Sequence, residues 1–257
     1  MIDIHCHILP GIDDGPQLLE QSIDMARAAV EIGITTIIAT PHHLNGRYNT
    51  PAELVFEAVD LLNNELNNRQ IPLKIEAGQE IHVHPALIHE FYRGNLCSLA
   101  NSRYMLLELP TKQVPPFFQD VLHELKINGI TPIIAHPERN RELMNSRRMV
   151  LDLFEKGVLF QITANSITGL FGRKAQKFCL YLCKKNYLHF ISSDSHDLYR
   201  RTFGLRTSYS TLAKQFGDEY VERLQRNALR VLEDKLIISA ESANVSRNWL
   251  PWFSRKL

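Results

Sequence analysis

The chain has 257 residues, of which 44% are hydrophobic and 22% charged, as expected for a globular protein of one large domain or two small ones. Its 29 Lys and Arg against 28 Asp and Glu leave a net charge of +1, which argues against a broad basic surface for nucleic acid. The apolar runs are too short to span a membrane and the 4 cysteines too few for a disulfide scaffold, so a cytoplasmic protein without membrane insertion is expected.

Short apolar runs alternate with amphipathic helical stretches along the chain. Most of these runs are continuous rather than alternating, which is typical of parallel strands buried on both faces. The first helical stretch repeats Leu19, Ile23, Ala26 and Val30 at spacings of three or four and is followed by Gly33, a common helix end. The predicted strands are 2–8, 35–40, 73–81, 104–109, 131–136, 158–163 and 188–192. Further helices are predicted over about 51–70, 115–128, 140–156 and 170–186, with two more in 206–234.

Strands that are each followed by a helix predict a closed or nearly closed parallel α/β barrel, similar to a TIM barrel, rather than a doubly wound sheet. One barrel accounts for residues 1–240 without a linker. Residues 241–257 differ, because they combine Trp249, Trp252 and Phe253 with basic side chains. This tail either packs on the barrel or contacts a partner.

Residues of metal-binding type recur where the predicted strands end. The C-terminal ends of the strands in a parallel barrel meet at one rim, and catalytic residues lie there. His5 and His7 are two residues apart, so they point to the same side of the first strand. The other candidates are Asp14 in the first loop, His42, Glu80, Glu108 and His136 at successive strand ends, and Asp194 and His196 after the last strand.

Nine nitrogen and oxygen donors exceed the roughly four to six positions around one ion, so they suit a cluster of two or three ions. Carboxylates held close together would raise one another's pKa unless cations neutralised them. The absence of cysteine from the set argues against a structural zinc site. The oxygen-rich set favours Mn²⁺ in a hydrolytic role, with Fe or Zn as alternatives.

The motifs that carry these residues resemble those of the PHP (polymerase and histidinol phosphatase) metallohydrolases. They are His5-Cys-His7, Thr40-Pro-His42, Gly78-Gln-Glu80, Glu108, Ala135-His136-Pro-Glu-Arg-Asn140 and Ser193-Asp194-Ser-His196. Segments 3–15 and 136–141 resemble more narrowly the bacterial tyrosine-protein phosphatase branch, which is associated with capsule and exopolysaccharide production. The resemblance covers about residues 1–235 and implies a distorted (β/α)₇ barrel with three metal ions.

The resemblance also implies which residues hold each ion. His5, His7, Glu80 and Asp194 would bind the first ion. Glu80, Glu108 and His136 would bind the second, with Glu80 bridging. Asp14, His42 and His196 would bind the third, although the neighbouring Asp13 is an alternative to Asp14.

Residues and resemblance together predict a metal-dependent phosphomonoesterase that acts on phosphotyrosine, with a bacterial tyrosine kinase as its expected partner. A bound divalent ion makes hydroxide available near neutral pH. Arg139 lies three residues after His136 and can reach the same rim, where its guanidinium suits phosphate; a salt bridge to Glu138 or Glu142 is the alternative. Arg206 is a second phosphate-binding candidate, and His42 or His196 could protonate the leaving group. Tyr48 could stack on the phosphotyrosine ring.

Other functions remain open at this point. Histidinol phosphate or another small phosphomonoester needs the same ions, and a non-catalytic barrel could act as a scaffold for a membrane-bound kinase. Cys97 and Arg103 form a C-x5-R match of the kind that cysteine-dependent phosphatases use, but this match precedes a strand instead of following one. A nuclease would be expected to carry more basic surface, and no predicted strand end offers the lysine typical of amidohydrolases. The oligomeric state is left open.

Overall fold

A computed structural model describes residues 1–237, so the predicted tail at 241–257 lies outside the described residues. All the predicted strands are present. The predicted strand 73–81 is interrupted and forms two short strands, and an additional short strand at 42–43 follows the predicted strand 35–40. In chain order they are β1 (Ile2–Cys6), β2 (Thr36–Ala39), β3 (His42–His43), β4 (Lys74–Ala77), β5 (Glu80–His82), β6 (Tyr104–Glu108), β7 (Thr131–Ala135), β8 (Leu159–Thr163) and β9 (Phe190–Ser192).

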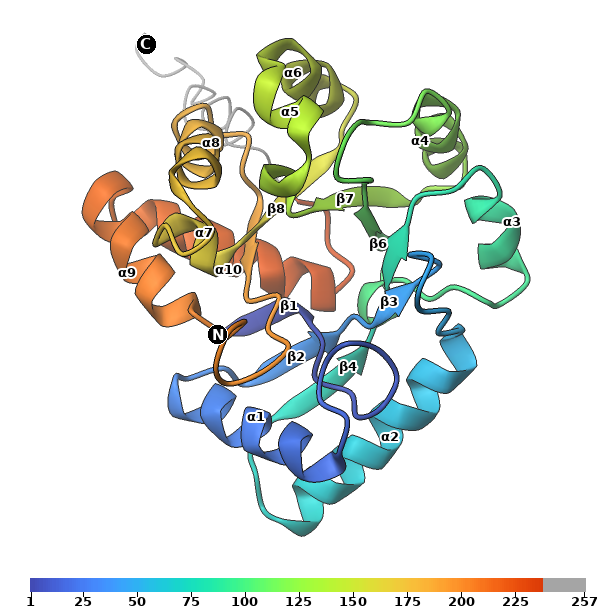
Figure 1. Cartoon of the computed structure of the whole chain (residues 1–257), viewed down its shortest axis with the longest axis vertical. Coiled ribbons are helices and arrows are strands. Elements are labelled where there is room, and N and C mark those ends of the chain that lie inside the picture. Colours follow the sequence, from blue (N-terminus) through green and yellow to red (C-terminus); the bar gives the residue numbers. More distant parts are fainter. Residues whose placement is uncertain (238–257) are drawn as a thin grey trace, which may run out of the picture.

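The helices surround the strands (Figure 1). They are α1 (Leu19–Glu31), α2 (Ala52–Asn68), α3 (Leu87–Tyr92), α4 (Phe118–Ile127), α5 (Arg141–Asn145), α6 (Arg147–Glu155), α7 (Ala164–Ile167), α8 (Arg173–Lys184), α9 (Leu205–Phe216) and α10 (Asp218–Leu232), with 3₁₀ turns η1 (Leu99–Asn101) and η2 (Pro137–Arg139). The single helix predicted over 140–156 is wrong. Ser146 is extended there (φ −119°, ψ 96°) and caps α6 by accepting a hydrogen bond from the Met149 amide. Among the described residues, no helix is both long and apolar enough to cross a bilayer.

The strands form two parallel sheets, in the orders β1-β2-β4 and β3-β5-β6-β7-β8-β9. The first sheet passes into the second where β2 continues as β3 and β4 continues as β5. Pro41 lies at the first interruption and has no amide hydrogen to donate. Gly78 lies at the second, where a Cβ atom would come within 2.8 Å of Ile38 Cγ2. The strand pairing therefore confirms a parallel α/β fold but not a single closed barrel.

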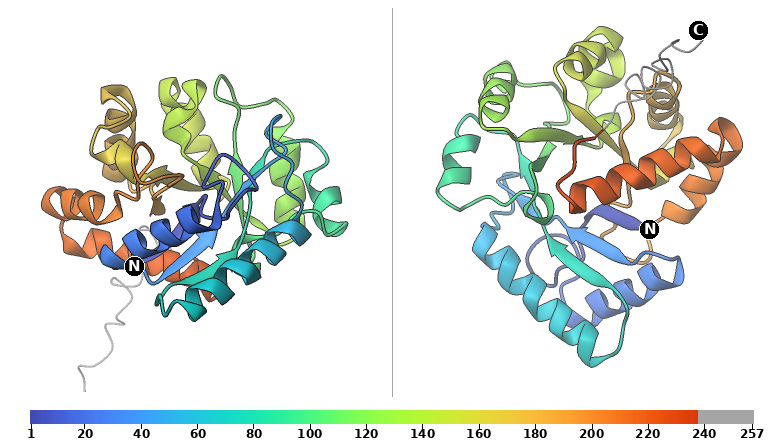
Figure 2. Two further views of the ribbon diagram at one scale, coloured as in Figure 1. Left: turned by 60° about the horizontal axis from the view of Figure 1, so that its bottom comes forward. Right: turned by 180° about the vertical axis from the view of Figure 1, so that it is seen from behind.

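Helix α10 covers the end of the molecule where the strands begin (Figure 2, right), and it contacts β1, β9 and η1. A compact apolar cluster fills the centre at this end. Its buried members are Ile4, Ile38, Leu99, Tyr104, Leu106, Ile133, Ala135, Leu159, Phe190, Ala228 and Val231. The opposite end, where the strands finish, is left to polar side chains from the strand ends and loops.

Candidate metal centre

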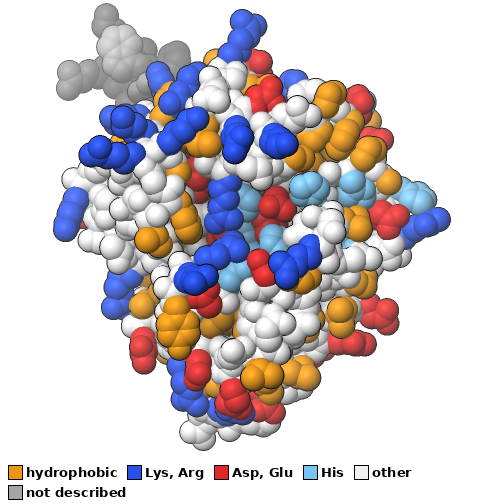
Figure 3. All heavy atoms as spheres, in the orientation of Figure 1, with side chains coloured by type: hydrophobic (Ala, Val, Ile, Leu, Met, Phe, Trp, Pro, Cys, Tyr) orange, Lys and Arg blue, Asp and Glu red, His pale blue; other side chains and the backbone are white. Residues whose placement is uncertain are grey.

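The structure brings all nine predicted ligand residues together at the C-terminal ends of the strands. Figure 3 shows histidine and acidic side chains in the middle of this face, with Lys and Arg side chains around them. Glu108 is half-buried and the Asp14 side chain is 35% exposed, whereas the other seven are buried. Ionisable groups are rarely buried in such numbers unless they pair with one another or bind metal.

Three sets of donor atoms in this cluster are each compact enough to hold one ion, because the atoms of a set lie within 4.8 Å of one another. The sets are His7, Asp14, His42 and His196; His5, His7 and Glu80; and His42, Glu80 and Glu108. Glu80 belongs to two sets, as expected for a bridging ligand. His7 and His42 are also shared between sets, which differs from the grouping that the resemblance implies.

His136 and Asp194 adjoin these sets. His136 Nε2 lies 2.5 Å from Glu80 Oε1, and Asp194 Oδ1 lies 3.5 Å from Nε2 of both His5 and His7. Both His136 and Asp194 have left-handed backbones, with φ of 30° and 52°. This conformation costs about 1–2 kcal/mol for a residue with a Cβ atom. Such strain is concentrated at functional sites, which supports a functional placement of both side chains.

Hydrogen bonds fix the orientation of three imidazoles. His5 Nδ1 donates to Gln161 Oε1 at 2.9 Å, and His7 Nδ1 donates to Asp13 Oδ2 at 2.6 Å. His196 Nδ1 donates to the carbonyl oxygen of Asp194 at 3.0 Å. The lone pair on each Nε2 is therefore available to an ion, as is usual for histidine ligands whose other nitrogen is hydrogen-bonded.

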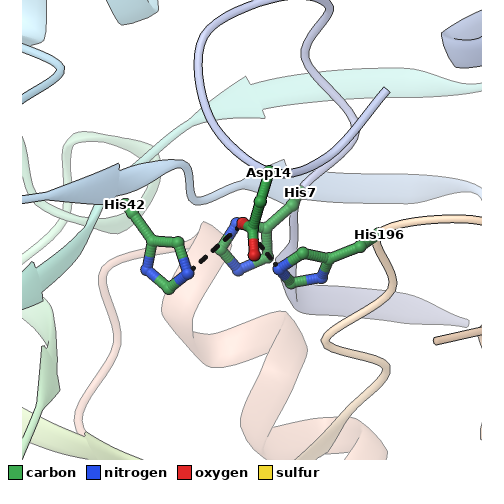
Figure 4. Close-up of side chains that lie close together, drawn as sticks. All are labelled: His7, Asp14, His42 and His196. Carbon is green, nitrogen blue, oxygen red and sulfur yellow. Dashed lines mark ion pairs between the residues drawn. The ribbon is translucent and has the colours of Figure 1, made fainter. Parts of the chain in front are cut away.

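Asp13 and Asp14 have different environments. Asp13 is buried and already accepts hydrogen bonds from His7 and from the amides of Gly15 and His42. Asp14 instead faces the cluster, with Oδ1 3.2 Å from His196 Nε2 and 3.5 Å from His42 Nε2 (Figure 4). Gly15 allows this loop to approach β1, because a Cβ atom there would lie 2.3 Å from the His7 carbonyl oxygen. The geometry favours Asp14 as the donor to an ion and Asp13 as the residue that orients His7.

Three buried atoms of the cluster are paired with other members of the donor sets. His42 Nδ1 lies 2.9 Å from Glu80 Oε2, and His196 Nε2 lies 3.2 Å from Asp14 Oδ1. Buried imidazoles and carboxylates held this close need protons or metal ions to neutralise the carboxylates. All of these atoms belong to the sets described above, so the residues present fit divalent ions well.

Imidazoles and carboxylates of the cluster stabilise each other's charge in the absence of ions. Burial would raise the pKa of Glu80, but the imidazoles of His5, His42 and His136 hold this pKa well below its usual range. Burial likewise disfavours the protonated form of His5, yet the Glu80 and Asp194 carboxylates raise its pKa to about 9. The cluster thus requires positive charge next to its carboxylates, whether protons or metal ions supply it.

Arg139 reaches the cluster as predicted. Its guanidinium donates to Asp194 Oδ2 and to Thr163 Oγ1 and lies 5.3 Å from the centre of the Phe171 ring. Its ion-pair partner is Asp194, rather than the Glu138 or Glu142 of the alternative interpretation.

A second arginine at the cluster is Arg201, which the sequence analysis missed. Its Nη2 donates to Asp194 Oδ1 at 2.7 Å, and its Nη1 lies 3.6 Å from Asp14 Oδ2. The only sequence signal was a basic residue five positions after His196.

Arg206, the second predicted phosphate-binding residue, lies elsewhere. It is exposed and donates to the carbonyl oxygens of Glu31 and Ile32, both at 3.2 Å. These carbonyls end α1, next to Met1 and the beginning of β1. The Arg206 guanidinium therefore lies against the end of α1 and the beginning of β1, away from the cluster.

The remaining candidates are placed as follows. His82 Nδ1 lies 3.3 Å from Glu108 Oε2, whereas His84 belongs to none of the three donor sets. Tyr48 stacks on His42 with ring centres 6.2 Å apart. Cys97 is buried, and burial raises the pKa of its thiol to about 12, so it lacks the reactive thiolate of a cysteine-dependent phosphatase.

Comparisons with known proteins agree with this geometry. Residues 1–233 match the family described as "Capsular polysaccharide synthesis, CpsB/CapC". The chain is 42% identical over 250 residues to tyrosine-protein phosphatase YwqE of Bacillus subtilis, covering 97% of this chain and 98% of the relative. It is 34% identical over 237 residues to the putative tyrosine-protein phosphatase CapC of Staphylococcus aureus, covering 92% and 93%.

Among solved structures, the chain resembles one from work on YwqE of Bacillus subtilis and CpsB of Streptococcus pneumoniae, described as metal-dependent tyrosine phosphatases. The TM-score is 0.90 at 42% identity, over 93% of this chain and 97% of that chain. An organophosphorus hydrolase from Deinococcus radiodurans matches with a TM-score of 0.55 at 14% identity, over 90% and 91%. This second likeness shows a shared fold only.

Proposed function

The chain belongs to the CpsB/CapC family of capsular polysaccharide synthesis proteins, and from that premise we propose that it is a metal-dependent tyrosine-protein phosphatase. The observation that carries the proposal is the largely buried cluster of imidazoles and carboxylates, whose donor atoms form three sets that are each compact enough to hold one ion. Relatives named as tyrosine-protein phosphatases match over 92% or more of the chain, which supports the same activity here.

We propose three divalent ions as cofactors, held by the nine residues of the cluster. Imidazole nitrogens and carboxylate oxygens without any thiolate favour Mn²⁺, with Fe or Zn as alternatives. When bound, such ions lower the pKa of water to about 7 and neutralise charge on the phosphoryl group.

Arg139 and Arg201 are proposed to bind the phosphate. Both guanidiniums lie at the edge of the cluster and share Asp194 as a partner. A phosphate placed between them could accept hydrogen bonds from both, and charge-assisted bonds of this kind are roughly twice as strong as neutral ones. Arg206 has no part in this role.

Protonation of the leaving group needs little help, because the phenol of tyrosine has a pKa of about 10. Burial and the nearby His7 lower the pKa of His196 to about 4, so His196 is neutral and its Nε2 carries no proton to donate. His42 belongs to two of the donor sets. With both histidines as ligands, we infer that water supplies the proton.

We further infer that the two sheets act as one distorted (β/α)₇ barrel. The amide of His7 donates to the Ser195 carbonyl at 2.9 Å, which supports a closure between β1 and β9.

The family description supports a substrate that belongs to capsule or exopolysaccharide synthesis. We propose a bacterial tyrosine kinase as the phosphotyrosine partner and the cytoplasm as the location.

The test is an assay of the purified chain against a phosphotyrosine peptide and against histidinol phosphate, with Mn²⁺ and then with EDTA. We expect metal-dependent release of phosphate from the peptide, and its loss in His136→Ala. The exposed His123 on α4 provides the matched control, because His123→Ala removes an imidazole far from the donor sets.

Each alternative function predicts a different result of this assay. Preferential turnover of histidinol phosphate would favour a small-molecule phosphatase. The absence of both bound metal and turnover would favour a scaffold. Activity that EDTA leaves unchanged would contradict the proposal outright.

A further inference from the structure

A cavity of about 240 Å³ opens beside the metal centre, at the side formed by Asp14 and His196. Its apolar lining residues are Pro16, Met25 and Leu198, together with Tyr199, which is 92% exposed. Asp14 and His196, which also line it, belong to the same donor set, and His196 is 3% exposed. The cavity therefore borders the metal centre.

The wall from the β1–α1 segment is held in place by hydrogen bonds within the protein. Gln17 Nε2 donates to the carbonyl oxygens of Asp13 and Gly15 at 2.9 and 2.8 Å. Gln21 Oε1 accepts from the amides of Gln17 and Leu18 at 2.8 and 3.1 Å. Gln17 Nε2 and Gln21 Oε1 are thus already engaged, and these hydrogen bonds brace the loop that carries Asp14.

The opposite wall, after β9, is braced in a similar way. Asp197 Oδ1 accepts hydrogen bonds from the amides of Tyr199 and Arg200 at 2.6 and 2.5 Å. Leu198 lies between these anchored residues. Both walls are therefore formed before any ligand binds, which reduces the entropy that binding would otherwise cost.

We propose that this cavity binds the aromatic ring of the phosphotyrosine substrate; the inference rests on the proposed phosphatase function. In phosphotyrosine only the ester oxygen separates phosphorus from the ring, so a phosphate at the ions places the ring next to the cluster. The cavity offers an apolar surface at that position, and burial of an aromatic ring is strongly favourable. A small alkyl ester would leave this surface uncovered, so the cavity selects aryl esters.

Tyr48 is the other aromatic surface near the cluster. Its ring is nearly parallel to the His42 imidazole, at 9°, and the Arg47 guanidinium lies 5.1 Å from its centre. Tyr48 is thus packed against protein groups on its own loop and strand, whereas the cavity beside His196 is open to a ligand.

The experiment compares the binding of phenylphosphonate and methylphosphonate to the metal-loaded protein by calorimetry, because neither compound is hydrolysed. We expect the unchanged protein to bind phenylphosphonate about tenfold more tightly, a difference of about 1.4 kcal/mol. Leu198→Trp should fill the cavity and abolish this preference. Leu170→Trp is the matched control, since Leu170 is 61% exposed on another loop and does not line the cavity.

Metal content is measured for each variant, so that a loss of ions is not mistaken for a loss of the ring site. Equal binding of the two phosphonates by the unchanged protein, or a preference that survives Leu198→Trp, would overturn the inference. Loss of the preference in Tyr48→Leu alone would also overturn it, by placing the ring on Tyr48. In each of these cases hydrolysis of the phosphotyrosine peptide would persist, whereas failure of the proposed function would abolish hydrolysis itself.

Discussion

Two adjacent carboxylates, Asp13 and Asp14, contribute to the cluster in different ways. Asp14 belongs to a donor set, whereas Asp13 accepts from His7 Nδ1 and from two backbone amides. We expect Asp14→Asn to lower the number of ions bound per chain. Asp13→Asn should keep that number and weaken affinity by about 10–100-fold, the usual effect of losing a group that orients a ligand. Elemental analysis with calorimetric metal titration separates the two, and loss of an ion only in Asp13→Asn would reverse the assignment.

A comparison of alanine variants at Arg201 and Arg206 tests which of the two arginines binds phosphate. Arg201→Ala removes a guanidinium that donates to Asp194 inside the cluster, and we expect kcat/KM for a phosphotyrosine peptide to fall by about 100-fold. Arg206→Ala removes contacts to the end of α1 only, so kcat/KM should stay within twofold. Steady-state kinetics at saturating Mn²⁺ measures both, and equal effects would show that Arg201 acts through general charge rather than contact.

At the scale of single residues, the sequence predicts the nine candidate ligands and Arg139 but not Arg201. The candidate ligands can be recognised because they lie at or next to strand ends, whose direction and position follow from the parallel topology. Arg201 depends on a loop instead: the amide of His196 and the hydroxyl of Ser195 both donate to the Arg201 carbonyl at 2.9 Å, which turns the chain back toward the cluster. Sequence spacing does not encode such a return of the chain, so the sequence favours Arg206 instead of Arg201 as a phosphate-binding candidate.

At the scale of single elements, continuous apolar runs located the strands well because they are buried on both faces. Helix boundaries are harder to predict from the sequence where the apolar pattern continues across a break between two helices. Leu143 in α5 and Val150 and Leu153 in α6 are all buried and maintain one helical pattern across Ser146. The short helices α3 and α7 were not predicted, because one or two turns carry too little periodicity to be recognised.

The break between α5 and α6 leads to a prediction about stability. Ser146→Ala removes the hydroxyl that accepts from the Met149 amide, and we expect the free energy of unfolding to fall by about 1 kcal/mol. Urea denaturation monitored by circular dichroism measures this, and kcat should not change. Ser210→Ala, at an exposed position within α9, should be neutral or slightly stabilising because alanine has the higher helix propensity. Similar losses in both variants would show that the cap contributes nothing.

At the scale of the whole molecule, the division of the strands into two sheets determines where the residues of the metal centre lie. Where β2 and β4 are interrupted, the chain resumes pairing as β3 and β5, and His42 then lies opposite Glu80 in the new register. This pairing places an imidazole and a carboxylate from neighbouring strands within one donor set. The alternation of strands and helices predicted the parallel fold. It did not predict the interruption, which depends on a missing amide at Pro41 and close packing at Gly78.

The charge balance of the cluster makes the stability of the molecule depend on both pH and metal. Burial lowers the pKa of His42, but the Glu80 and Glu108 carboxylates outweigh it and raise this pKa to about 9. The pKa of His5 is raised to about 9 in the same way. A histidine whose pKa is raised on folding stabilises the protein fully below its ordinary pKa of 6.5, and this contribution disappears as pH rises through 9.

We therefore expect opposite pH trends with and without ions. In EDTA, the melting temperature should fall between about pH 6.5 and pH 9, because His5 and His42 lose the protons that neutralise the buried carboxylates. With saturating Mn²⁺ the ions replace those protons, and their binding strengthens as pH rises because protons no longer compete for the imidazoles. Scanning calorimetry across this range should show the gap between the two curves widening with pH. Parallel curves would mean that the ions do not bind next to Glu80. In that case they would not replace the protonated imidazoles that neutralise its carboxylate when no ions are bound.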